Sequence, residues 1–375
     1  MEKRKFLIMT ASIGAGHTQA AVAVRDALAE KFPHAEIHML DFMDRRISAF
    51  NSMLKWLYLH MLDFVPNLYD VFYQLSGGAS GGTAARQLTA AGMYPVMARL
   101  LKKYQPDVLI CTHPFPEAAA SLWKRIGRRK LHLIAVLTDY SLHQIWIYPR
   151  VDAFFTATEE MRQGLISMGF AEASVQACGI PISPRIRQVP DRRVIREALG
   201  IGAESRVVLL MGGGLGLGGI ENTLDELEGM RRPLTFFVIA GRNQELEQRV
   251  AERAERSRHQ IRVWGYTREV QSLMQASDIL ITKPGALTMS EAFALGLPML
   301  LHEPIPGPET ENAVFAEARG AAVWIHAGES LAAVLEDILQ HPARLQAMAD
   351  AARACGKPDA ANKIAAWIHE SKLFS

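Results

Sequence analysis

One histidine lies in a glycine loop near the start of the sequence, where its ring could act as a base. The loop Gly14-Ala-Gly16-His17 follows an apolar run over residues 5–10 and leads into an amphipathic segment. A side chain at such a strand-to-helix turn is expected to face a ligand cleft rather than the core. A neutral imidazole can take a proton from an attacking hydroxyl at physiological pH. We therefore interpret His17 as a candidate general base; the competing interpretation is a histidine that only caps the turn.

Backbone amides of two glycine loops are candidates for binding an anion. The first loop contains Gly16, and the second is the run 212–219, which includes Gly213 and Gly214. Glycines let the N–H groups at the amino end of a helix approach a ligand closely, and the helix dipole there favours negative charge. These three glycines are therefore predicted to contact the phosphate groups of a ligand.

Neither glycine loop is a complete dinucleotide fingerprint. The pattern Gly214-x-Gly216-x-x-Gly219 matches formally, but the next predicted strand ends in Ala240-Gly-Arg242 without the acidic residue that binds a ribose. The first loop has Gln19 at the third glycine position, although the second predicted strand ends in Asp41. A nicotinamide-dependent enzyme therefore remains an alternative, and only the first loop could bind its cofactor. A P-loop ATPase is excluded, because no Gly-Lys-Ser/Thr follows either loop.

A third group of residues has the types needed to hold a nucleotide sugar. Pro284-Gly285 ends a predicted strand and opens a helix whose first N–H groups suit a diphosphate. Glu291, one turn into that helix, can accept from both vicinal hydroxyls of a ribose, and Glu309 with Asn312 offers the acceptor and donor that a hexose needs. Taken singly, each could be a helix cap or a solvated acid. The residues predicted to cradle the diphosphate are Ala286, Leu287, Thr288, Met289 and Ser290.

These residues are positioned by an alternation of short apolar runs and amphipathic segments. Such alternation is typical of parallel sheets covered by helices on both faces, an α/β fold. The Pro-rich stretch 179–185 separates two sets of predicted strands and helices. It predicts domains at 1–180 and 181–375, with a C-terminal helix that can pack back on the first domain. Two doubly wound domains would place a cleft at the carboxyl ends of both sheets. The predicted strands are 5–10, 36–42, 107–112, 132–138, 153–158, 206–211, 234–240, 261–264, 279–282, 298–301 and 321–325, and the amphipathic segments include 20–31, 243–256 and 331–340.

Composition narrows the class of protein. With 375 residues, 49% apolar and 21% charged, the chain is in the globular range, and its net charge of +2 argues against a nucleic-acid partner. Its three cysteines are far apart in sequence, which disfavours a disulfide framework or a zinc site and predicts a reducing, cytoplasmic compartment. The first apolar run is too short for a secretory signal, and no run of about 18 apolar residues predicts a spanning helix.

The net charge conceals an uneven distribution. Residues 1–180 carry +4 and the remainder −2, and the first half includes the basic cluster 124–130. Residues 45–105 contain an aromatic amphipathic helix with Trp56 on its apolar face, followed by the glycine-rich loop 76–82. Such a helix is more often core, and such a cluster is as often a solvated helix end. Together they favour a surface that binds anionic lipid.

The sequence resembles the processive diacylglycerol glucosyltransferases and monogalactosyldiacylglycerol synthases, a family related to the bacterial GlcNAc transferase that makes lipid II. The resemblance covers nearly the whole chain. The segments that carry it are GAGH at 14–17, TDYSLHQIW at 138–146, CGIPISP at 178–184, GYTREVQSLMQASDILITKPGALTMSEA at 265–292 and GLPMLLHEPIPGPETEN at 296–312.

The resemblance implies a GT-B fold, in which two Rossmann-like domains flank a cleft, and an inverting transfer of a hexose from a UDP-sugar to diacylglycerol. It implies UDP-glucose or UDP-galactose as substrate, no cofactor, no metal, and a peripheral location on the inner face of the cell membrane. Under it, His17 resembles the base, Gly265 and Tyr266 hold uracil, and Glu291 and Glu309 bind ribose and sugar. His143 and Trp146 resemble acceptor-side positions that contact lipid.

Two departures from the family pattern leave parts of this interpretation open. Ser183 stands where relatives often have an arginine, so Arg185 or Arg187 would have to supply that charge to the diphosphate. Pro308 stands where a glutamine usually precedes the sugar-binding glutamate, so the choice of hexose is open. Two alternative functions also remain: transfer to another lipid-linked or soluble acceptor, and a weakly catalytic regulator that binds nucleotide sugars.

Overall fold

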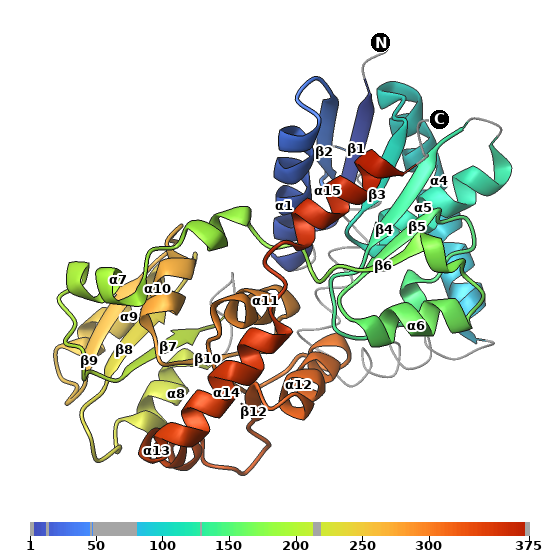
Figure 1. Cartoon of the computed structure of the whole chain (residues 1–375). Coiled ribbons are helices and arrows are strands. Elements are labelled where there is room, and N and C mark those ends of the chain that lie inside the picture. The colour runs from blue at the N-terminus through green and yellow to red at the C-terminus, as the bar shows by residue number, and fades with distance from the viewer. Residues whose placement is uncertain are drawn as a thin grey trace. The chain divides into compact units, whose positions relative to one another are not determined.

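A computed structural model of the chain describes residues 4–12, 15–45, 47, 81–127, 130–212 and 219–371. The chain divides into two units (Figure 1). Unit 1 comprises Met1–Pro184, Pro306–Pro308 and Pro358–Ser375, and unit 2 comprises Arg185–Ile305 and Glu309–Lys357. The predicted aromatic helix with Trp56, residues 76–80 of the predicted loop 76–82, Gly14, Gly213 and Gly214 lie outside the described residues. The last two residues of that predicted loop, Gly81 and Gly82, instead begin a helix.

Unit 1 is built on a parallel six-stranded sheet of order β2-β1-β3-β4-β5-β6. The strands are β1 (Lys5–Thr10), β2 (Glu36–Asp41), β3 (Val108–Cys111), β4 (His132–Val136), β5 (Ala153–Thr156) and β6 (Val175–Ala177). Side chains on both faces of the central strands are buried: Ile8 and Ile110 on one face, Leu7 and Leu109 on the other. This explains why the strands appear in the sequence as continuous apolar runs and not as an alternation of apolar and polar residues.

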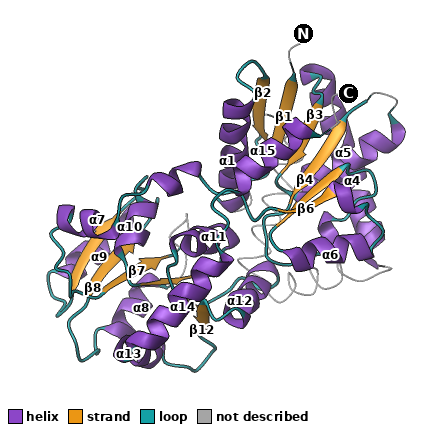
Figure 2. Ribbon diagram, in the orientation of Figure 1, coloured by secondary structure: helices purple, strands orange, loops and turns teal. Residues whose placement is uncertain are grey.

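Helices cover both faces of the first sheet (Figure 2). They are α1 (Gly16–Lys31), α4 (Gly81–Tyr104), α5 (Pro114–Ile126), α6 (Glu159–Ser167) and α15 (Ala360–Glu370). The small residues Ala21, Ala23 and Ala27 let α1 lie close to the sheet, where they share one core with Ile364 and Ile368 of α15. The last helix of the chain therefore completes the core of unit 1.

We expect Ile364→Ala to lower the free energy of unfolding of unit 1 by about 2–5 kcal/mol, because it leaves a cavity between α15 and the sheet. Ile364 is fully buried, whereas Lys363 beside it is exposed. Lys363→Ala is therefore the matched control and should change stability by less than about 0.5 kcal/mol. Urea unfolding together with hydrogen exchange of the α1 amides measures the effect. Equal stability of the two variants would contradict this role of α15.

Unit 2 contains a second parallel six-stranded sheet, of order β12-β11-β10-β7-β8-β9. Its strands are β7 (Val207–Met211), β8 (Thr235–Ile239), β9 (Gln260–Trp264), β10 (Ile279–Thr282), β11 (Met299–Leu301) and β12 (Ala322–Trp324). The helices are α7 (Arg192–Ala198), α8 (Ile220–Leu227), α9 (Gln244–Ala254), α10 (Val270–Ala276), α11 (Ala286–Leu295), α12 (Pro308–Ala318), α13 (Leu331–Gln340) and α14 (Pro342–Cys355). Two Rossmann-like units of this kind confirm the predicted α/β class.

Helix α11 has clear start and stop signals. It begins directly after Pro284-Gly285 and ends at Gly296, whose φ of 65° is in the left-handed region that favours glycine. There the N–H of Leu297 donates to the carbonyl of Ala292 (2.9 Å), which closes the helix. The amino end of α11 is thus fixed at the carboxyl end of β10.

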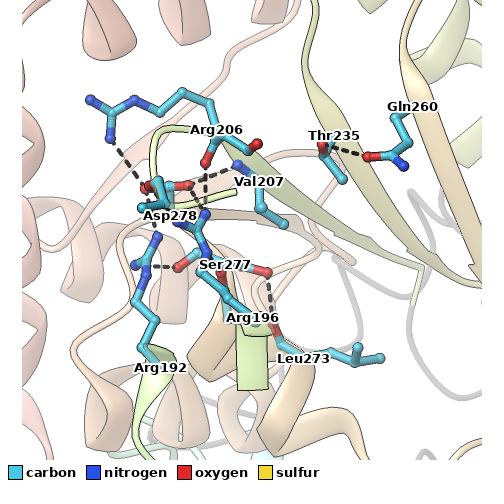
Figure 3. A network of polar contacts seen from close by, with 12 residues as sticks. Arg192, Arg196, Arg206, Val207, Thr235, Gln260, Leu273, Ser277 and Asp278 are labelled. Carbon is cyan, nitrogen blue, oxygen red and sulfur yellow. Dashed lines mark hydrogen bonds and ion pairs between the residues drawn. The ribbon is translucent and has the colours of Figure 1, made fainter. Parts of the chain in front are cut away.

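Asp278 organises the opposite, amino-terminal edge of this sheet. It directly precedes β10, is 8% exposed, and accepts from the N–H of Val207 (2.7 Å). Its carboxylate also accepts from Arg192 (2.7 Å) and Arg196 (3.1 Å) of α7 (Figure 3). This network fastens α7 to the sheet, and because it lies away from the loops that follow the strands, we assign it a structural role.

The structure confirms the predicted strands to within two residues at each end and adds β6, which the sequence reading did not predict. β6 is only three residues long and mixes polar with apolar side chains, so it has no periodicity to detect. Among the described residues, no helix combines the length and apolarity needed to cross a bilayer.

Candidate functional site

In unit 1, the candidate site lies at the switch point of the sheet. The chain leaves β1 toward β2 on one side, and β3 and β4 continue on the other, so the loops after β1 and β3 diverge there. Pairing of Met9 with Cys111 aligns the ends of these two strands. His17 follows β1, and Thr112 and His113 follow β3, so this crevice brings together residues about 95 positions apart in sequence.

Hydrogen bonds hold the His17 ring in one tautomer. Its Nδ1 is 3.1 Å from the carbonyl oxygen of Thr112 and 2.7 Å from Oγ1 of Thr138. A carbonyl can only accept, so Nδ1 carries the hydrogen and donates it. In the neutral ring, Nε2 is then left with a lone pair. The hydroxyl of Thr112 in turn donates to the carbonyl of His17 (2.9 Å), which fixes the first turn of α1.

The environment keeps His17 neutral. The residue is half-buried, and burial lowers its pKa to about 4, with the bond to the Thr112 carbonyl acting in the opposite direction. The ring of His113 lies with its centroid 4.6 Å away in an edge-to-face arrangement. Burial, and then the nearby His17, hold the pKa of His113 well below its usual range. Both imidazoles are therefore uncharged at neutral pH.

The structure thus adds Thr112, His113 and Thr138 to the site around His17. All three are buried polar residues. A signal for two of them was present, because the predicted strands 107–112 and 132–138 end in Thr112 and Thr138, and ligands in open α/β sheets bind at the carboxyl ends of strands. Their pairing with His17 depends on the strand order, which the sequence alone does not specify.

The predicted acceptor-side residues have different surroundings from those expected. His143 and Trp146 border the short 3-10 helix Gln144–Trp146, where the Nδ1 of His143 accepts from the N–H of Ile145 (3.2 Å). Trp146 is only 2% exposed, so its indole packs inside the unit and does not present a lipid-facing surface. We correct the role of Trp146 to that of a packing residue, and the acceptor-side role of His143 stays a prediction. Trp56 lies outside the described residues.

In unit 2, the second candidate site also lies at a switch point, between β7 and β10. Gly285 is the N-cap of α11 and supplies no side-chain cap, and the first N–H groups of a helix have no intrahelical acceptor. The N–H of Met289 already donates to the carbonyl of Gly285 (3.0 Å). The hydroxyl of Ser290 donates to the carbonyl of Ala286 (2.7 Å). Within the predicted cradle 286–290, the amides of Ala286, Leu287 and Thr288 have no intrahelical acceptor, and their contact with a diphosphate stays a prediction.

Glu291 is held in place on α11 by a residue of α10. Nε2 of Gln271 donates to its Oε1 at 3.0 Å, and the carboxyl group is half-buried. Burial raises the pKa of Glu291, and the bond from Gln271 opposes that shift. Its remaining lone pairs can accept hydrogen bonds, and the contact of Glu291 with a ribose stays a prediction.

Glu309 and Asn312 of α12 both lie beside the start of α11. The Oε1 of Glu309 is 3.9 Å from the position that a Cβ on Gly285 would occupy, and its Oε2 accepts from the N–H of Ile305 (2.8 Å). Asn312 is 1% exposed, and its amide donates to the carbonyl of Pro284 (3.1 Å). Asn312 therefore supports the loop that starts α11, which corrects its predicted direct contact with sugar.

Gly265 and Tyr266 follow the end of β9. Tyr266 is 64% exposed, and the guanidinium of Arg242 lies 5.2 Å from the centroid of its ring. A Cβ on Gly265 would come within 2.3 Å of the carboxylate of Glu247, so a larger residue here would require the Glu247 side chain to move. The predicted contact of Gly265 and Tyr266 with uracil stays a prediction.

Several other predicted features have a defined position. Arg185 and Arg187 are exposed in the 3-10 helix Pro184–Gln188. Asp41, on which the nicotinamide alternative depended, accepts from the N–H groups of Ser12 (3.1 Å) and Met43 (3.0 Å) and so supports a turn. Within the described part of the chain, no group of three or more His, Cys, Asp or Glu side chains is placed to hold a metal ion.

Comparison with known proteins identifies similar chains. Residues 17–182 match the family model of monogalactosyldiacylglycerol (MGDG) synthase, and residues 207–364 match the C-terminal domain of glycosyltransferase family 28. A processive diacylglycerol beta-glucosyltransferase of Bacillus cytotoxicus is 30% identical over 372 residues, which cover 98% of this chain and 93% of that protein.

Solved structures share the fold at low sequence identity. MurG of Acinetobacter baumannii superposes with a TM-score of 0.65 at 18% identity, covering 98% of this chain and all of that one. HepE of Anabaena, in complex with UDP-glucose, gives a TM-score of 0.56 at 15% identity, covering 96% of this chain and 98% of that one. These likenesses show a GT-B arrangement of two Rossmann-like domains.

Proposed function

Because this chain belongs to the family of the monogalactosyldiacylglycerol synthases and processive diacylglycerol beta-glucosyltransferases, with a glycosyltransferase family 28 C-terminal domain, we propose that it is an inverting hexosyltransferase. It moves glucose or galactose from a UDP-sugar to diacylglycerol and forms a β-glycosyl glycolipid. The observation that carries this proposal is the match to a diacylglycerol glucosyltransferase along 98% of the chain.

In this proposal, unit 1 binds the acceptor and unit 2 the donor. The amides of Ala286–Thr288 meet the diphosphate, Glu291 binds the ribose, and Glu309 binds the sugar. The UDP-sugar is a substrate and leaves as UDP, so no resident cofactor is invoked. The neighbour crystallised with UDP-glucose is in keeping with this donor class.

His17 activates the acceptor. Its Nε2 takes the proton of the glycerol hydroxyl, while the carbonyl of Thr112 and the hydroxyl of Thr138 hold Nδ1–H and keep the ring oriented. The oxygen attacks the anomeric carbon, and UDP departs with the bonding pair, its charge met by the N–H groups at the start of α11. Attack opposite to the leaving group inverts an α-linked donor to a β-linked product.

We propose that the protein works at an anionic membrane surface on the cytoplasmic side, where its lipid substrate lies. At the end of α5, Arg125 and Lys130 are exposed next to Ile126, which is 60% exposed. A hydrophobic side chain flanked by bases suits the boundary between headgroups and acyl chains. Lys124 is paired with Asp152 and half-buried, so it is not available to the lipid.

Activity should persist at a lower pH than for an ordinary histidine base. Because the pKa of His17 is lowered to about 4, we expect kcat/KM to stay high as pH falls below 6.5 and to be lost only as it falls through about 4. Between these values the unfolded chain binds more protons than the folded one, so stability itself declines as pH falls. A pH profile of initial rates, with circular dichroism at each pH, separates the two effects. An acidic limb near 6.5 in the folded protein would contradict this environment for His17.

A donor and acceptor screen tests the proposed function. Purified protein is incubated with UDP-glucose, UDP-galactose or UDP-GlcNAc and with vesicles that contain diacylglycerol, ceramide or neither. We expect UDP release coupled to glycolipid only with diacylglycerol and a UDP-hexose. UDP release that depends on a different acceptor, or binding of UDP-sugar without turnover, would overturn the proposal.

A further inference from the structure

His113 occupies a defined position next to His17 that the mechanism above does not use. It lies two residues after the end of β3 and is the N-cap of α5, where its Nδ1 accepts from the N–H of Phe115 at 3.1 Å. An acceptor nitrogen carries no hydrogen, so in the neutral ring the hydrogen is on Nε2. The residue is 6% exposed, and this Nε2 has no partner among the residues that the structure describes.

The two imidazoles therefore have opposite tautomers. His17 has its hydrogen on Nδ1 and a lone pair on Nε2, whereas His113 has a lone pair engaged at Nδ1 and a hydrogen on Nε2. The ring centroids are 4.6 Å apart in an edge-to-face arrangement at the switch point of the sheet, a separation at which one hydroxyl group could contact both rings. One ring offers an acceptor there and the other a donor.

A hydroxyl group is complementary to this pair, because it donates one hydrogen and accepts through its oxygen. We propose that His113 is a second acceptor-binding residue, whose Nε2–H donates to the oxygen of the same hydroxyl that His17 deprotonates. The inference deepens the proposed function and rests on it. In this arrangement His113 orients the acceptor hydroxyl, which a single base cannot do.

The chemical step balances without any further group. The hydroxyl proton passes to Nε2 of His17, and one oxygen lone pair forms the bond to the anomeric carbon. The bond from that carbon to the diphosphate oxygen breaks, and its electron pair leaves with UDP. His113 keeps its proton throughout and holds the other lone pair of the attacking oxygen, which restricts the direction of attack.

The competing role for His113 is that of an N-cap alone, and two variants separate the roles. In His113→Asn the side chain is short, so its oxygen can still cap Phe115 but no donor reaches the Nε2 position. In His113→Gln the amide is one carbon longer, so its N–H can reach the Nε2 position while the cap is weakened. Thermal unfolding of both variants measures the cap.

We expect His113→Asn to lower kcat/KM for diacylglycerol about tenfold, the size of one lost hydrogen bond, with the KM for the UDP-sugar unchanged. His113→Gln should stay within about threefold of the unmodified protein even if its unfolding temperature is lower. Unchanged acceptor kinetics in His113→Asn, or an equal loss in both folded variants, would overturn the inference. Absence of transferase activity in the unmodified protein would instead overturn the proposed function, so the two failures are distinguishable.

Discussion

Replacement of His17 by alanine is expected to lower kcat by about 10²- to 10⁴-fold, the range contributed by a positioned general base. In the proposed mechanism, the neutral Nε2 of His17 takes the acceptor proton, and alanine has no group that can do so. Because His17 belongs to unit 1 and most of the proposed donor-binding residues, including Glu291, belong to unit 2, we expect the affinity for UDP-sugar to stay unchanged. Initial rates at saturating donor and acceptor, with calorimetric titration of UDP, measure both quantities.

His34 is the matched control for this substitution. It lies in the turn after α1 and is exposed, so His34→Ala removes an imidazole near the same helix without touching the switch point. Its kcat should equal that of the unmodified protein. A His17→Ala variant with full turnover would show that the base is another group.

Replacement of Glu291 by alanine is expected to raise the KM for the UDP-sugar by about 10- to 100-fold, because hydrogen bonds to a charged group contribute about 1.5–3 kcal/mol. Gln271 holds one carboxylate oxygen at 3.0 Å, so the side chain is ordered before the ribose arrives. The KM for diacylglycerol should not change. Glu291→Gln, which keeps the shape but removes the charge, should give an intermediate value.

Glu252 provides the control for the loss of one negative charge from unit 2. It is exposed on α9, where it accepts from Gln248, so Glu252→Ala should leave all kinetic constants unchanged. If Glu291→Ala bound UDP as tightly as the unmodified protein, the ribose would have to lie elsewhere. An equal loss in both variants would point to net charge rather than to a contact.

The fold was predictable because its strands are buried on both faces. Runs such as Phe6–Met9 and Val207–Leu210 have no polar residue, and the segments between them repeat at helical spacing. The short strand β6 was missed because three mixed residues show no pattern. The order of the strands could not be predicted from the sequence, because it depends on which apolar runs pair with one another in the sheet.

The candidate site was predictable in its chemistry and less so in its geometry. His17 was identified from a glycine loop before a helix, but its partner Thr138 is 121 residues away. Conversely, Asn312 and Trp146 have side chains typical of binding sites, and the structure buries both. Residue type indicates what a side chain can do, whereas tertiary packing decides whether a ligand can reach it.

The central claim is the transfer of a hexose from UDP to diacylglycerol with inversion. It is tested most directly by mass spectrometry and proton NMR of the lipid formed when the purified protein meets UDP-α-glucose, UDP-α-galactose and diacylglycerol vesicles. The account predicts a hexosyl-diacylglycerol with a β-anomeric proton and one UDP released for each sugar added. An α-linked lipid, or UDP release with free hexose and no glycolipid, would contradict it.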